Sequence, residues 1–452
     1  MRTAILWAAV AGLAMLQGAS VTAAELRTSL RPQVRPVGLR IVTRDETVTR
    51  EAMPVVSLRP VLRPTQAAKP AVVQVSAVNP GFANWIRGFR GRAGAAGVQG
   101  RVFDAAFSGV QYDPGVVKLD RNQSEFTKQI WEYLDSAVSP TRISNGKREL
   151  RRHRRTLERI EAHFGVEKEV VTAIWGMESA YGARRGSRPL IQSLATLAYD
   201  GRRGRFFEKQ LIAALKIVQA GDVAPRLMTG SWAGAMGHTQ FIPTSYLAYA
   251  VDFTGDGRRD IWSDDPTDAL ASTAAYLARF GWRKGQPWGV EVILPRGFDP
   301  ARARRSLTQA PSAWAAEGVR DIHGRPVPNY GDASILLPAG TQGAAFMIFH
   351  NFSVIEKYNK ADAYVIGVGH LSDRLKGGPA IQANWPRQYQ STTSRQKKEI
   401  QRHLKRRGYD VQAIDGLIGP KTITAIRAFQ KLRGMPPDGY PSRQLLKALK
   451  GG

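Results

Sequence analysis

Hydrophobic residues recur every three or four positions through the middle of the chain, the spacing of one face of an α-helix. Leu157, Ile160 and Phe164 share such a face on a basic helix that follows Ser144-Asn145 and ends at Gly165. The same spacing predicts four more helices, over residues 167–179, 206–220, 267–280 and about 343–358. Most of the chain beyond residue 80 is therefore predicted to be helical.

Two short segments break this helical pattern. Residues 290–294 and 333–337 are rich in β-branched and aliphatic side chains and lie between proline- and glycine-containing loops. Runs of this length and composition are typical of strands. The fold class predicted for the region is mainly α with a minor β element.

The N-terminal 80 residues follow neither pattern. A positive Arg2, an apolar run over residues 4–15 and small residues at 21–24 are typical of a cleaved secretory signal peptide, predicted at 1–24. A membrane anchor is the alternative, but the run is too short to span a bilayer comfortably. Residues 25–80, where Ser-Leu-Arg-Pro occurs twice, predict a disordered Pro/Arg-rich tether, or else an arm packed on the surface.

Composition narrows the class of protein. The 452 residues suffice for two or three domains. The chain has no cysteine, which excludes disulfides, thiol catalysis and a lipoprotein anchor. No later segment is apolar enough for a transmembrane anchor, so we expect a soluble, periplasmic protein. The net charge of +28 favours a polyanionic partner; for an exported protein we expect peptidoglycan rather than nucleic acid, unless the charge only aids solubility.

A candidate general acid lies at the end of the helix predicted over 167–179. Val171, Ile174 and Glu178 fall on one face of that helix, so a carboxyl group shares the face that looks buried. Burial and the nearby helix C-terminus would both raise its pKa, as protonation of a glycosidic oxygen requires. The alternative is a surface Glu178 that faces solvent or pairs with Arg184 or Arg185.

Three segments, taken together, resemble a known family. They are Trp175-Gly176-Met177-Glu178-Ser179-Ala180-Tyr181-Gly182, Ser231-Trp232-Ala233-Gly234-Ala235-Met236-Gly237-His238-Thr239-Gln240-Phe241-Ile242-Pro243-Thr244-Ser245-Tyr246, and Tyr358-Asn359 with Tyr364. Their order and separations resemble the B-type lytic murein transglycosylases over about residues 81–375. The resemblance implies a lysozyme-like helical catalytic domain, which we predict over residues 81–384.

The same resemblance implies roles for individual residues. Glu178 would act as general acid and then as base, while Ser231 and Gln240 would hydrogen-bond the sugar in a glycan cleft completed by four residues: Tyr276, Tyr358, Asn359 and Tyr364. The β-1,4 bond between MurNAc and GlcNAc would be cleaved with formation of a 1,6-anhydromuramyl end, without a catalytic cofactor. We find no second acid in an equally strong motif; Asp200 and Glu208 lie in ordinary contexts.

Two other functions remain open at this stage. A hydrolytic muramidase would keep the fold but leave a reducing end, and a non-catalytic scaffold would only bind peptidoglycan. The sequence does not distinguish exo from endo cutting, and it names no protein partner.

An aspartate-rich loop begins at Asp252. Asp252, Thr254 and Asp256 occupy positions 1, 3 and 5 of a sequence that opens like an EF-hand calcium loop, with glycine at position 6. Position 12 is Ser263 rather than Glu, so the standard loop is not complete. The family resemblance implies a later closing aspartate, which we predict to be Asp268, with the carbonyl of Arg258 at position 7.

Asp264 and Asp265 are alternatives for the closing ligand, and a simple Asp/Gly turn without metal is the alternative to the whole site. The predicted ion is a structural Ca²⁺.

The last part of the chain forms a separate unit after a polar linker. Residues 394–450 predict three short helices and contain 14 Lys and Arg against 4 Asp and Glu. Their pattern of Asp415-Gly416, Thr422, Ala425, Phe429-Gln430 and Asp438-Gly439 resembles the small peptidoglycan-binding domain of many cell-wall enzymes. A generic helical bundle or a basic nucleic-acid module would be the alternative.

Overall fold

The computed structural model describes residues 79–121, 129–387 and 392–451. The predicted signal peptide and residues 25–78 of the predicted tether lie outside these ranges. No helix within the described ranges is long and apolar enough to cross a membrane.

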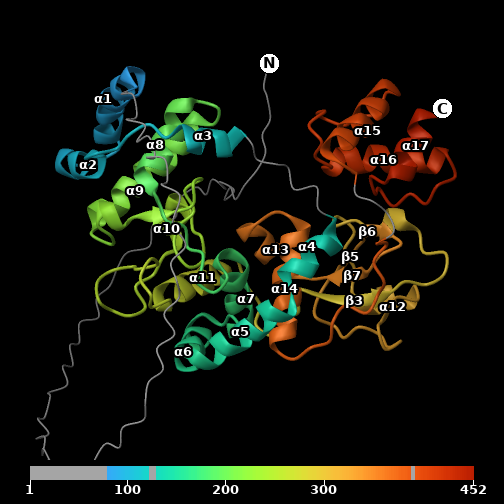
Figure 1. Ribbon diagram of the computed structural model, residues 1–452. Helices are drawn as coiled ribbons and strands as arrows, with labels where there is room; N and C mark the ends of the chain where they lie inside the picture. The colour runs from blue at the N-terminus through green and yellow to red at the C-terminus, as the bar shows by residue number, and fades with distance from the viewer. Residues whose placement is uncertain (1–78, 122–128, 388–391, 452) are drawn as a thin grey trace, which may run out of the picture. The chain divides into compact units, whose positions relative to one another are not determined.

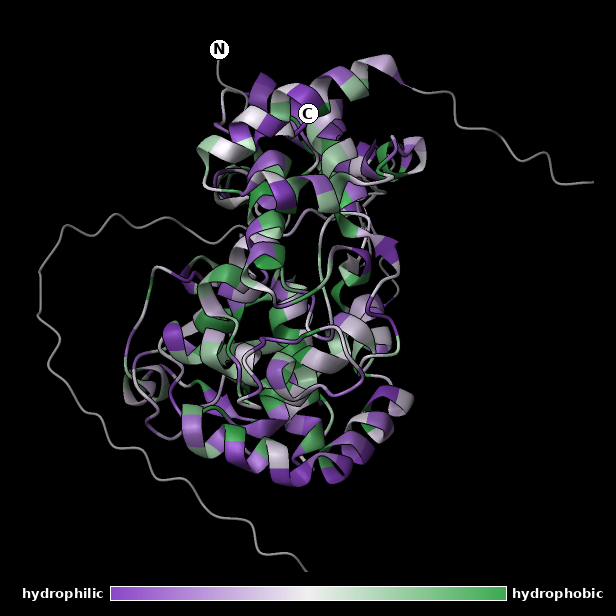
Figure 2. Cartoon of the chain, turned by 90° about the vertical axis from the view of Figure 1, so that its left-hand side faces the viewer, coloured by the Kyte–Doolittle hydropathy of each residue, from purple (hydrophilic) through white to green (hydrophobic). Residues whose placement is uncertain are grey.

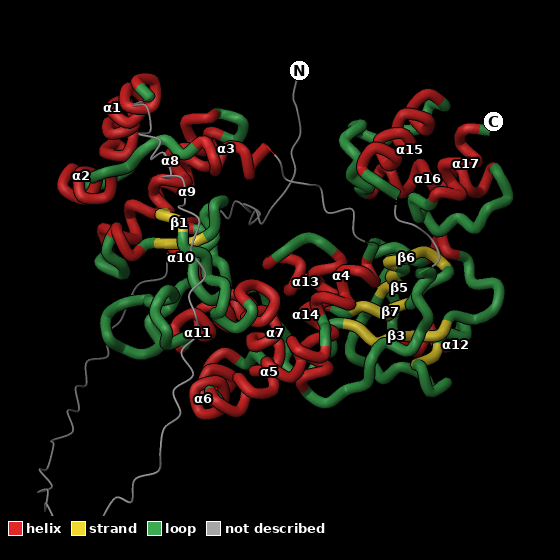
Figure 3. The backbone as a smooth tube through the Cα atoms, in the orientation of Figure 1, coloured by secondary structure: helices red, strands yellow, loops and turns green. Residues whose placement is uncertain are grey.

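Helices make up most of the structure, as Figures 1 and 3 show. Those that precede the sheet are α1 (Pro80–Ala95), α2 (Gly100–Phe107), α3 (Pro114–Arg121), α4 (Ile130–Ala137), α5 (Pro140–Arg152), α6 (Arg154–Phe164), α7 (Lys168–Ser179), α8 (Leu190–Asp200), α9 (Gly204–Ala220), α10 (Pro243–Tyr249) and α11 (Thr267–Arg279). The remaining helices before residue 387 are α12 (Pro311–Ala316), α13 (His350–Tyr358) and α14 (Asp362–Leu375), with short 3₁₀ turns at Pro225–Leu227 and Pro300–Arg302.

Helix α7 runs through the core and positions the candidate acid. Val171 and Ile174 are fully buried in it, as the hydrophobic pattern predicts. The helix packs against α14, α5, α11 and α6. At its start, the carboxylate of Glu167 accepts hydrogen bonds from Trp282 Nε1 (2.6 Å) and from the backbone amide of Gly285 (2.7 Å). Packing on several sides fixes α7 in the core, and these two hydrogen bonds hold its first turn.

The long basic helix of the sequence prediction is wrong in two respects. The first is its start: α5 begins at Pro140, where the Ser139 hydroxyl caps the amide of Arg142 at 3.3 Å. The second is its continuity, because the chain breaks at His153, which ends α5 and begins α6. The predicted stop at Gly165 is correct, since this residue adopts a left-handed conformation after α6.

A four-stranded antiparallel sheet forms the minor β element. Its strands are β3 (Gly289–Ile293), β4 (Arg320–Asp321), β5 (Ser334–Leu336) and β7 (Ala345–Ile348), in the order β4-β3-β7-β5. Gly289 of β3 and Ser334 of β5 are each paired with Ile348 of the central strand β7. β6 (Pro338–Thr341) lies outside this sheet, and β1 (Arg188–Pro189) pairs with β2 (Thr229–Gly230) elsewhere.

The helix predicted over about 343–358 is wrong in its first half. Residues 345–348 form β7, and only His350–Tyr358 is helical. β7 is the central strand between β3 and β5, and both faces of the sheet are covered at this strand: Phe346 and Ile348 pack in one core, Ala345 and Met347 in the other. Its four consecutive residues are therefore all apolar. A fully buried strand has no alternation of polar and apolar residues, and its sequence cannot be told from a buried helical turn by periodicity.

The C-terminal unit consists of the three predicted helices, α15 (Ser394–Arg406), α16 (Pro420–Leu432) and α17 (Arg443–Lys450). Its separate core is built from five main apolar residues: Ile400, Leu404, Ile426, Phe429 and Leu445. Hydrophilic and hydrophobic residues alternate along single helical ribbons in Figure 2, as expected for helices with one buried face. The mainly α fold class with a small helical C-terminal domain is confirmed.

Candidate active site

The carboxyl group of Glu178 lies at the last turn of α7, beside α14. Its Oε1 accepts a hydrogen bond of 2.6 Å from the hydroxyl of Tyr364, which α14 contributes. Burial raises the pKa of Glu178 from 4.5 to about 7, and the hydrogen bond from Tyr364 acts in the opposite direction. A carboxyl group with this pKa is protonated in a large fraction of molecules near neutral pH, as a general acid requires.

The backbone turns sharply after Glu178. Ala180, Tyr181 and Gly182 adopt left-handed conformations with φ of 52°, 61° and 85°. The turn brings the ring of Tyr181 back against Gly176, where a Cβ atom would lie 2.5 Å from the ring. The Tyr181 hydroxyl then donates to the carbonyl of Arg142 at 2.8 Å. These contacts explain the two glycines and the tyrosine of the segment 175–182, and they fix the turn that follows the acid.

Glu178 does not pair with the arginines that follow it. No salt bridge to Glu178 forms among the described residues, and Arg185 contacts Asp264 at 2.7 Å instead. The other two acids considered above pair with arginines, Asp200 with Arg121 (2.6 Å) and Glu208 with Arg92 (2.9 Å). Within the described part of the chain, no second carboxylate contributes to the pKa of Glu178.

Ser231 and Gln240 lie in the loop between β2 and α10. The Ser231 hydroxyl accepts a hydrogen bond from the amide of Ala235 at 3.0 Å, so it also shapes its own turn. Gln240 has a left-handed backbone (φ 55°), and its Nε2 donates to the carbonyls of Arg185 (3.0 Å) and Gly237 (2.8 Å). Its amide nitrogen therefore donates to two backbone carbonyls, which leaves the side-chain oxygen as the group that can face a sugar.

Tyr276 and Tyr358 are both core residues and pocket walls. Their hydroxyls donate to backbone carbonyls, Tyr276 to Lys357 at 2.6 Å and Tyr358 to Thr239 at 2.5 Å. The two rings meet edge to face at 5.1 Å. They line a surface pocket together with Gln240, Phe241, Ile242, Ser245 and Lys357. Sequence reasoning did not assign Phe241, Ile242 and Ser245 individually, although all three lie within the segment 231–246.

Asn359 and Tyr364 stand on either side of the turn between α13 and α14. The Asn359 side-chain oxygen accepts from the amide of Ala361 at 3.0 Å and so shapes this turn. The Tyr364 ring lies parallel to the ring of Tyr358, with 6.5 Å between centroids. Tyr133 of α4 also belongs to this environment, because burial and then the Glu178 charge raise its pKa to about 12. No motif in the sequence pointed to Tyr133.

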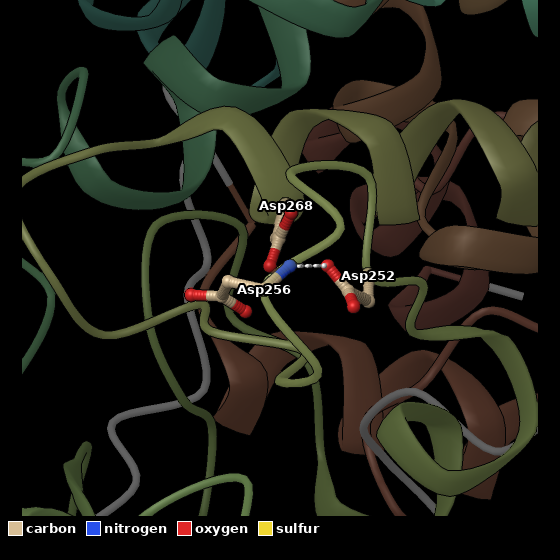
Figure 4. A group of neighbouring side chains, drawn as sticks. All are labelled: Asp252, Asp256 and Asp268. Atoms are coloured by element: carbon tan, nitrogen blue, oxygen red, sulfur yellow. Dashed lines mark hydrogen bonds between the residues drawn. The ribbon is translucent and has the colours of Figure 1, made fainter. Parts of the chain in front are cut away.

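The aspartate loop, residues 252–268, forms a second cluster of carboxylates. One carboxylate oxygen of each of Asp252, Asp256 and Asp268 lies within 4.8 Å of the others. Figure 4 shows the three side chains gathered at the loop. Asp268 enters from the first turn of α11 and is buried, whereas Asp256 is exposed. None of the three forms a salt bridge with a described residue.

Backbone amides hold these carboxylates in place. Asp252 accepts from the amides of Gly255 (2.7 Å) and Gly257 (2.8 Å), and from the hydroxyl of Thr254 (3.1 Å). Asp268 accepts from Phe253 and Thr254 with one oxygen, and from Asp260 with the other. Convergent oxygen atoms without a cationic side chain between them fit a hard divalent cation.

The two alternative closing aspartates point elsewhere. Asp264 pairs with Arg185, and Asp265 accepts hydrogen bonds from the amide and hydroxyl of Thr267 at the start of α11.

The helical fold, with one uncompensated carboxyl group beside tyrosines and a pocket, defines the class of single-acid, glycan-cleaving enzymes. The transglycosylase SLT domain family matches residues 81–373, and the putative peptidoglycan-binding domain family matches residues 394–449. The chain belongs to the transglycosylase SLT domain family and is, by class, a lytic transglycosylase. This confirms the resemblance found in the sequence.

Relatives of known structure or function support this membership. The membrane-bound lytic murein transglycosylase B of Escherichia coli K12 is 33% identical over 250 residues, which cover 54% of this chain and 66% of that protein. The chain thus spans just under two thirds of this relative. Crystal structures of SltB3 from Pseudomonas aeruginosa, in complex with NAG-anhNAM-pentapeptide or NAG-NAM-pentapeptide, are 50% identical with a TM-score of 0.79. The first covers 82% of this chain and 99% of SltB3; the second covers 81% and 99%.

A more distant structure is Escherichia coli Slt35 in complex with calcium. It is 29% identical, covers 66% of this chain and 93% of Slt35, and has a TM-score of 0.54.

Proposed function

We propose that this protein cleaves the β-1,4 bond between MurNAc and GlcNAc in peptidoglycan and leaves 1,6-anhydromuramyl ends. The observation that carries the proposal is the Glu178 carboxyl group, whose pKa of about 7 results from burial at a site that several tyrosines surround. The complexes of SltB3 with NAG-anhNAM-pentapeptide and NAG-NAM-pentapeptide support peptidoglycan as the substrate class.

Glu178 performs two proton transfers in this reaction. The Tyr364 hydroxyl donates to Oε1 of Glu178, so the acidic proton resides on Oε2. Glu178 gives this proton to the bridging oxygen as the bond from that oxygen to muramyl C1 breaks. The carboxylate then takes the proton of the muramyl C6 hydroxyl, whose oxygen forms the new bond to C1. Protons balance without water, and Glu178 ends in its starting state.

Surrounding residues support the charge that the carboxyl group acquires between these two steps. When Glu178 has given up its proton, the hydrogen bond from Tyr364 becomes charge-assisted and therefore stronger. The faces of Tyr358 and Tyr276 and the free side-chain oxygen of Gln240 are suited to a sugar ring with polar substituents. Ser231 and Asn359 shape the loops that carry these groups and remain candidates for sugar contacts.

Calcium has a structural role in this proposal. Asp252, Thr254, Asp256, the carbonyl of Arg258 and Asp268 would bind Ca²⁺ and tie the loop to α11. The convergent carboxylates and the calcium complex of Slt35 support this assignment. A cation with a filled oxygen shell would stabilise the loop and take no part in the proton transfers.

The remaining parts of the chain would bring the enzyme to its substrate. We propose export by the N-terminal signal sequence and action in the periplasm. The basic domain at residues 394–450 would bind peptidoglycan and raise the local substrate concentration for the catalytic domain.

Product analysis tests the proposal. Purified sacculi are digested with the wild-type chain or with the Glu178→Gln variant, and soluble products are identified by mass spectrometry. Wild type is expected to release muropeptides with anhydro ends, each one water lighter than the hydrolytic product. Reducing ends would identify a hydrolytic muramidase. Binding of sacculi without any Glu178-dependent product would identify a scaffold.

A further inference from the structure

His238 lies between the catalytic helix and the aspartate loop, and its polar groups contact both. On the side of α7, its Nδ1 accepts from the indole Nε1 of Trp175 at 3.0 Å, and its carbonyl accepts from the Ser179 hydroxyl at 2.5 Å. On the side of the loop, its amide donates to the carbonyl of Ile261 at 3.1 Å, and its Nε2 lies 2.8 Å from the carbonyl of Ser263. No polar group of His238 is left for another task.

The direction of these bonds follows from the partners. An indole nitrogen can only donate, so Nδ1 of His238 is the acceptor, and a neutral ring then carries its proton on Nε2. That proton goes to the carbonyl of Ser263 at 2.8 Å, while Nη1 of Arg185, also a donor, lies 3.1 Å from the same nitrogen without accepting from it. Such a ring is neutral, consistent with its 3% exposure and with burial lowering the pKa of His238. Histidine is suited to this position because it presents an acceptor and a donor in opposite directions from one rigid ring.

Neighbouring glycines leave room for the bridge. A Cβ atom on Gly182, in the turn after Glu178, would lie 2.6 Å from Nδ1 of His238. A Cβ atom on Gly237 would lie 2.2 Å from the carbonyl oxygen of Ile261. Both glycines have positive φ, of 85° and 68°. The close approach of the ring to α7, and of its own backbone to the loop, is therefore built into the local sequence.

The loop side of the bridge continues to the carboxylate cluster. Ser263, whose carbonyl faces His238, donates its amide to Oδ1 of Asp260 at 3.1 Å. Asp260 donates its own amide to Oδ2 of Asp268 at 3.0 Å. A continuous chain of hydrogen bonds thus runs from Asp268 through Asp260, Ser263 and His238 to Trp175, three residues before Glu178.

We propose that His238 is a positioning residue, which holds the last turn of α7 and its carboxyl group in register with the aspartate loop, so that cation binding at the loop orders the acid. This inference rests on the proposed function for the identity of the acid and on the proposed calcium site for the ligand. It adds a connection between them. Because a misplacement of about 1 Å can reduce a reaction rate by about 100-fold, a bridge of this kind matters for turnover. A connected path is not evidence of coupling in itself, so coupling must be measured.

Two indole hydrogen bonds at opposite ends of α7 provide a matched pair for the kinetic test. Trp175→Phe removes the indole donor to His238 at the catalytic end, whereas Trp282→Phe removes the indole donor to Glu167 at the other end. Both variants lose one indole N–H and keep an aromatic ring. Initial rates are measured on a soluble peptidoglycan oligosaccharide at saturating calcium, with circular dichroism and melting curves as folding controls.

We expect Trp175→Phe and His238→Ala to lower kcat by about 10- to 100-fold with KM changed less than about threefold. His238→Asn, whose amide oxygen can replace Nδ1 as the acceptor for Trp175, should recover part of the lost kcat. Trp282→Phe should keep kcat within about threefold of wild type, although its melting temperature should fall about as much as that of Trp175→Phe. Equal falls of kcat in both tryptophan variants would reduce His238 to a stability role and overturn the proposal.

A measurement without turnover separates this inference from the proposed function. The full-length chain is labelled with ¹⁵N at its tryptophan indoles, and the Trp175 signal is assigned from the Trp175→Phe variant. Calcium chloride is then titrated into the chelator-treated protein, with calorimetry reporting binding at the loop. The Trp175 signal is expected to shift with calcium in wild type and to lose this response in His238→Ala. The Trp314 indole, which donates to Ala333 near the sheet, serves as the internal control.

The titration decides the proposal even if the chain releases no anhydro product. A Trp175 signal that stays fixed while calcium binds, or that moves equally in His238→Ala, overturns the coupling. Absence of calcium binding in calorimetry also overturns it, because no cation would then act through the loop.

Discussion

Two acidic sites, the single carboxyl group of Glu178 and the carboxylates of the aspartate loop, show how the same functional group is set to different tasks. Glu178 is placed at a site where a single tyrosine hydroxyl contacts it, and burial raises its pKa to about 7. Burial acts on Asp252 as well, but the donors of Gly257, Gly255, Thr254 and Asp256 outweigh it and hold the pKa of Asp252 below its usual range. Between Glu178 and Asp252, the difference in pKa thus follows from how far the donors offset burial.

The two acidic sites also differ in the groups that surround them. The Glu178 carboxyl is bordered by tyrosines from α13 and α14, whose phenols stay neutral because burial raises their pKa well above 10. The loop carboxylates are bordered by backbone amides and by one another. Near neutral pH the first arrangement keeps a proton available, and the second keeps negative charge available for a cation.

The largest effect expected from this contrast is on turnover. Glu178→Gln should lower the release of soluble muropeptides by more than about 10³-fold, because it removes both the acid and the base. Asp256→Asn makes the same carboxyl-to-amide change in the loop and should retain most of the activity at saturating calcium. Release is measured by chromatography, and binding by co-sedimentation with sacculi.

Binding to sacculi should be the same for both variants and for wild type. A parallel loss of binding and release in Glu178→Gln would point to misfolding rather than to chemistry. If Glu178→Gln and Asp256→Asn release similarly reduced amounts of muropeptide, the two acidic sites would not differ in function as proposed.

A smaller effect is expected from the one hydrogen bond to the acid. Tyr364→Phe removes the donor that favours the ionised form of Glu178, so the pKa of Glu178 should rise further above 7. The alkaline limb of kcat/KM should move to higher pH, while kcat falls about tenfold because the charge left after proton donation is less stabilised. Tyr276→Phe, which loses a hydroxyl bonded to the Lys357 carbonyl, provides the control. An alkaline limb that stays in place, or moves to lower pH, would contradict this role for Tyr364.

Sequence reasoning succeeded where one short segment contained the signal. The face shared by Val171, Ile174 and Glu178 predicted a carboxyl group on a buried helix, and the family resemblance implies a role that remains a proposal. The spacing of Asp252, Thr254 and Asp256 predicted a loop whose two acids, Asp252 and Asp256, converge. In both cases the pattern on which the prediction rests lies within a few residues, or along one helical face.

Other features could not be predicted because they depend on residues far apart in the sequence. β7 is buried on both faces because its side chains point alternately into two separate hydrophobic cores, so its apolar run was taken for helix. The Gln240 amide is held by the carbonyl of Arg185, which no spacing rule connects to it. In the sequence, His238 is one residue of a segment that resembles the family, and nothing assigns it a role. In the structure its hydrogen bonds join α7 to a loop more than 20 residues further along the chain.

The pKa of Glu178 also predicts a pH-dependent stability difference. Because the folded-state pKa lies above 4.5, the contribution of this group is fully present below pH 4.5 and is lost as pH rises through about 7. Glu178→Gln should therefore melt like wild type near pH 4 and be more stable by at most about 3 kcal/mol at pH 8. Melting curves are compared at matched ionic strength across this interval.

Asp120 offers a comparison of opposite sign. Its side chain is buried, but hydrogen bonds from Arg202 and Arg203 outweigh the effect of burial and lower its pKa. Asp120→Asn should thus be less stable than wild type above about pH 4, where the stabilisation from the Asp120 carboxylate is fully present, and this difference should shrink as pH falls below about 4. If the stability difference between Glu178→Gln and wild type is the same at pH 4 and at pH 8, the carboxyl group of Glu178 has an ordinary pKa.

The smallest expected effect concerns the loop. Calcium at ten times its Kd should stabilise the folded chain by about 1.4 kcal/mol, because the cation binds the assembled carboxylates and not the unfolded chain. The melting temperature should therefore fall when a chelator is added to wild type, and this response should be much smaller in Asp256→Asn. Asp256 is the suitable position because it is exposed and its carboxylate accepts only the amide of Arg258 among the described residues, so its replacement disturbs the apo fold little. Identical melting curves for calcium-loaded and metal-stripped wild type would mean that the backbone amides alone satisfy these carboxylates, and that the loop is a turn rather than a cation site.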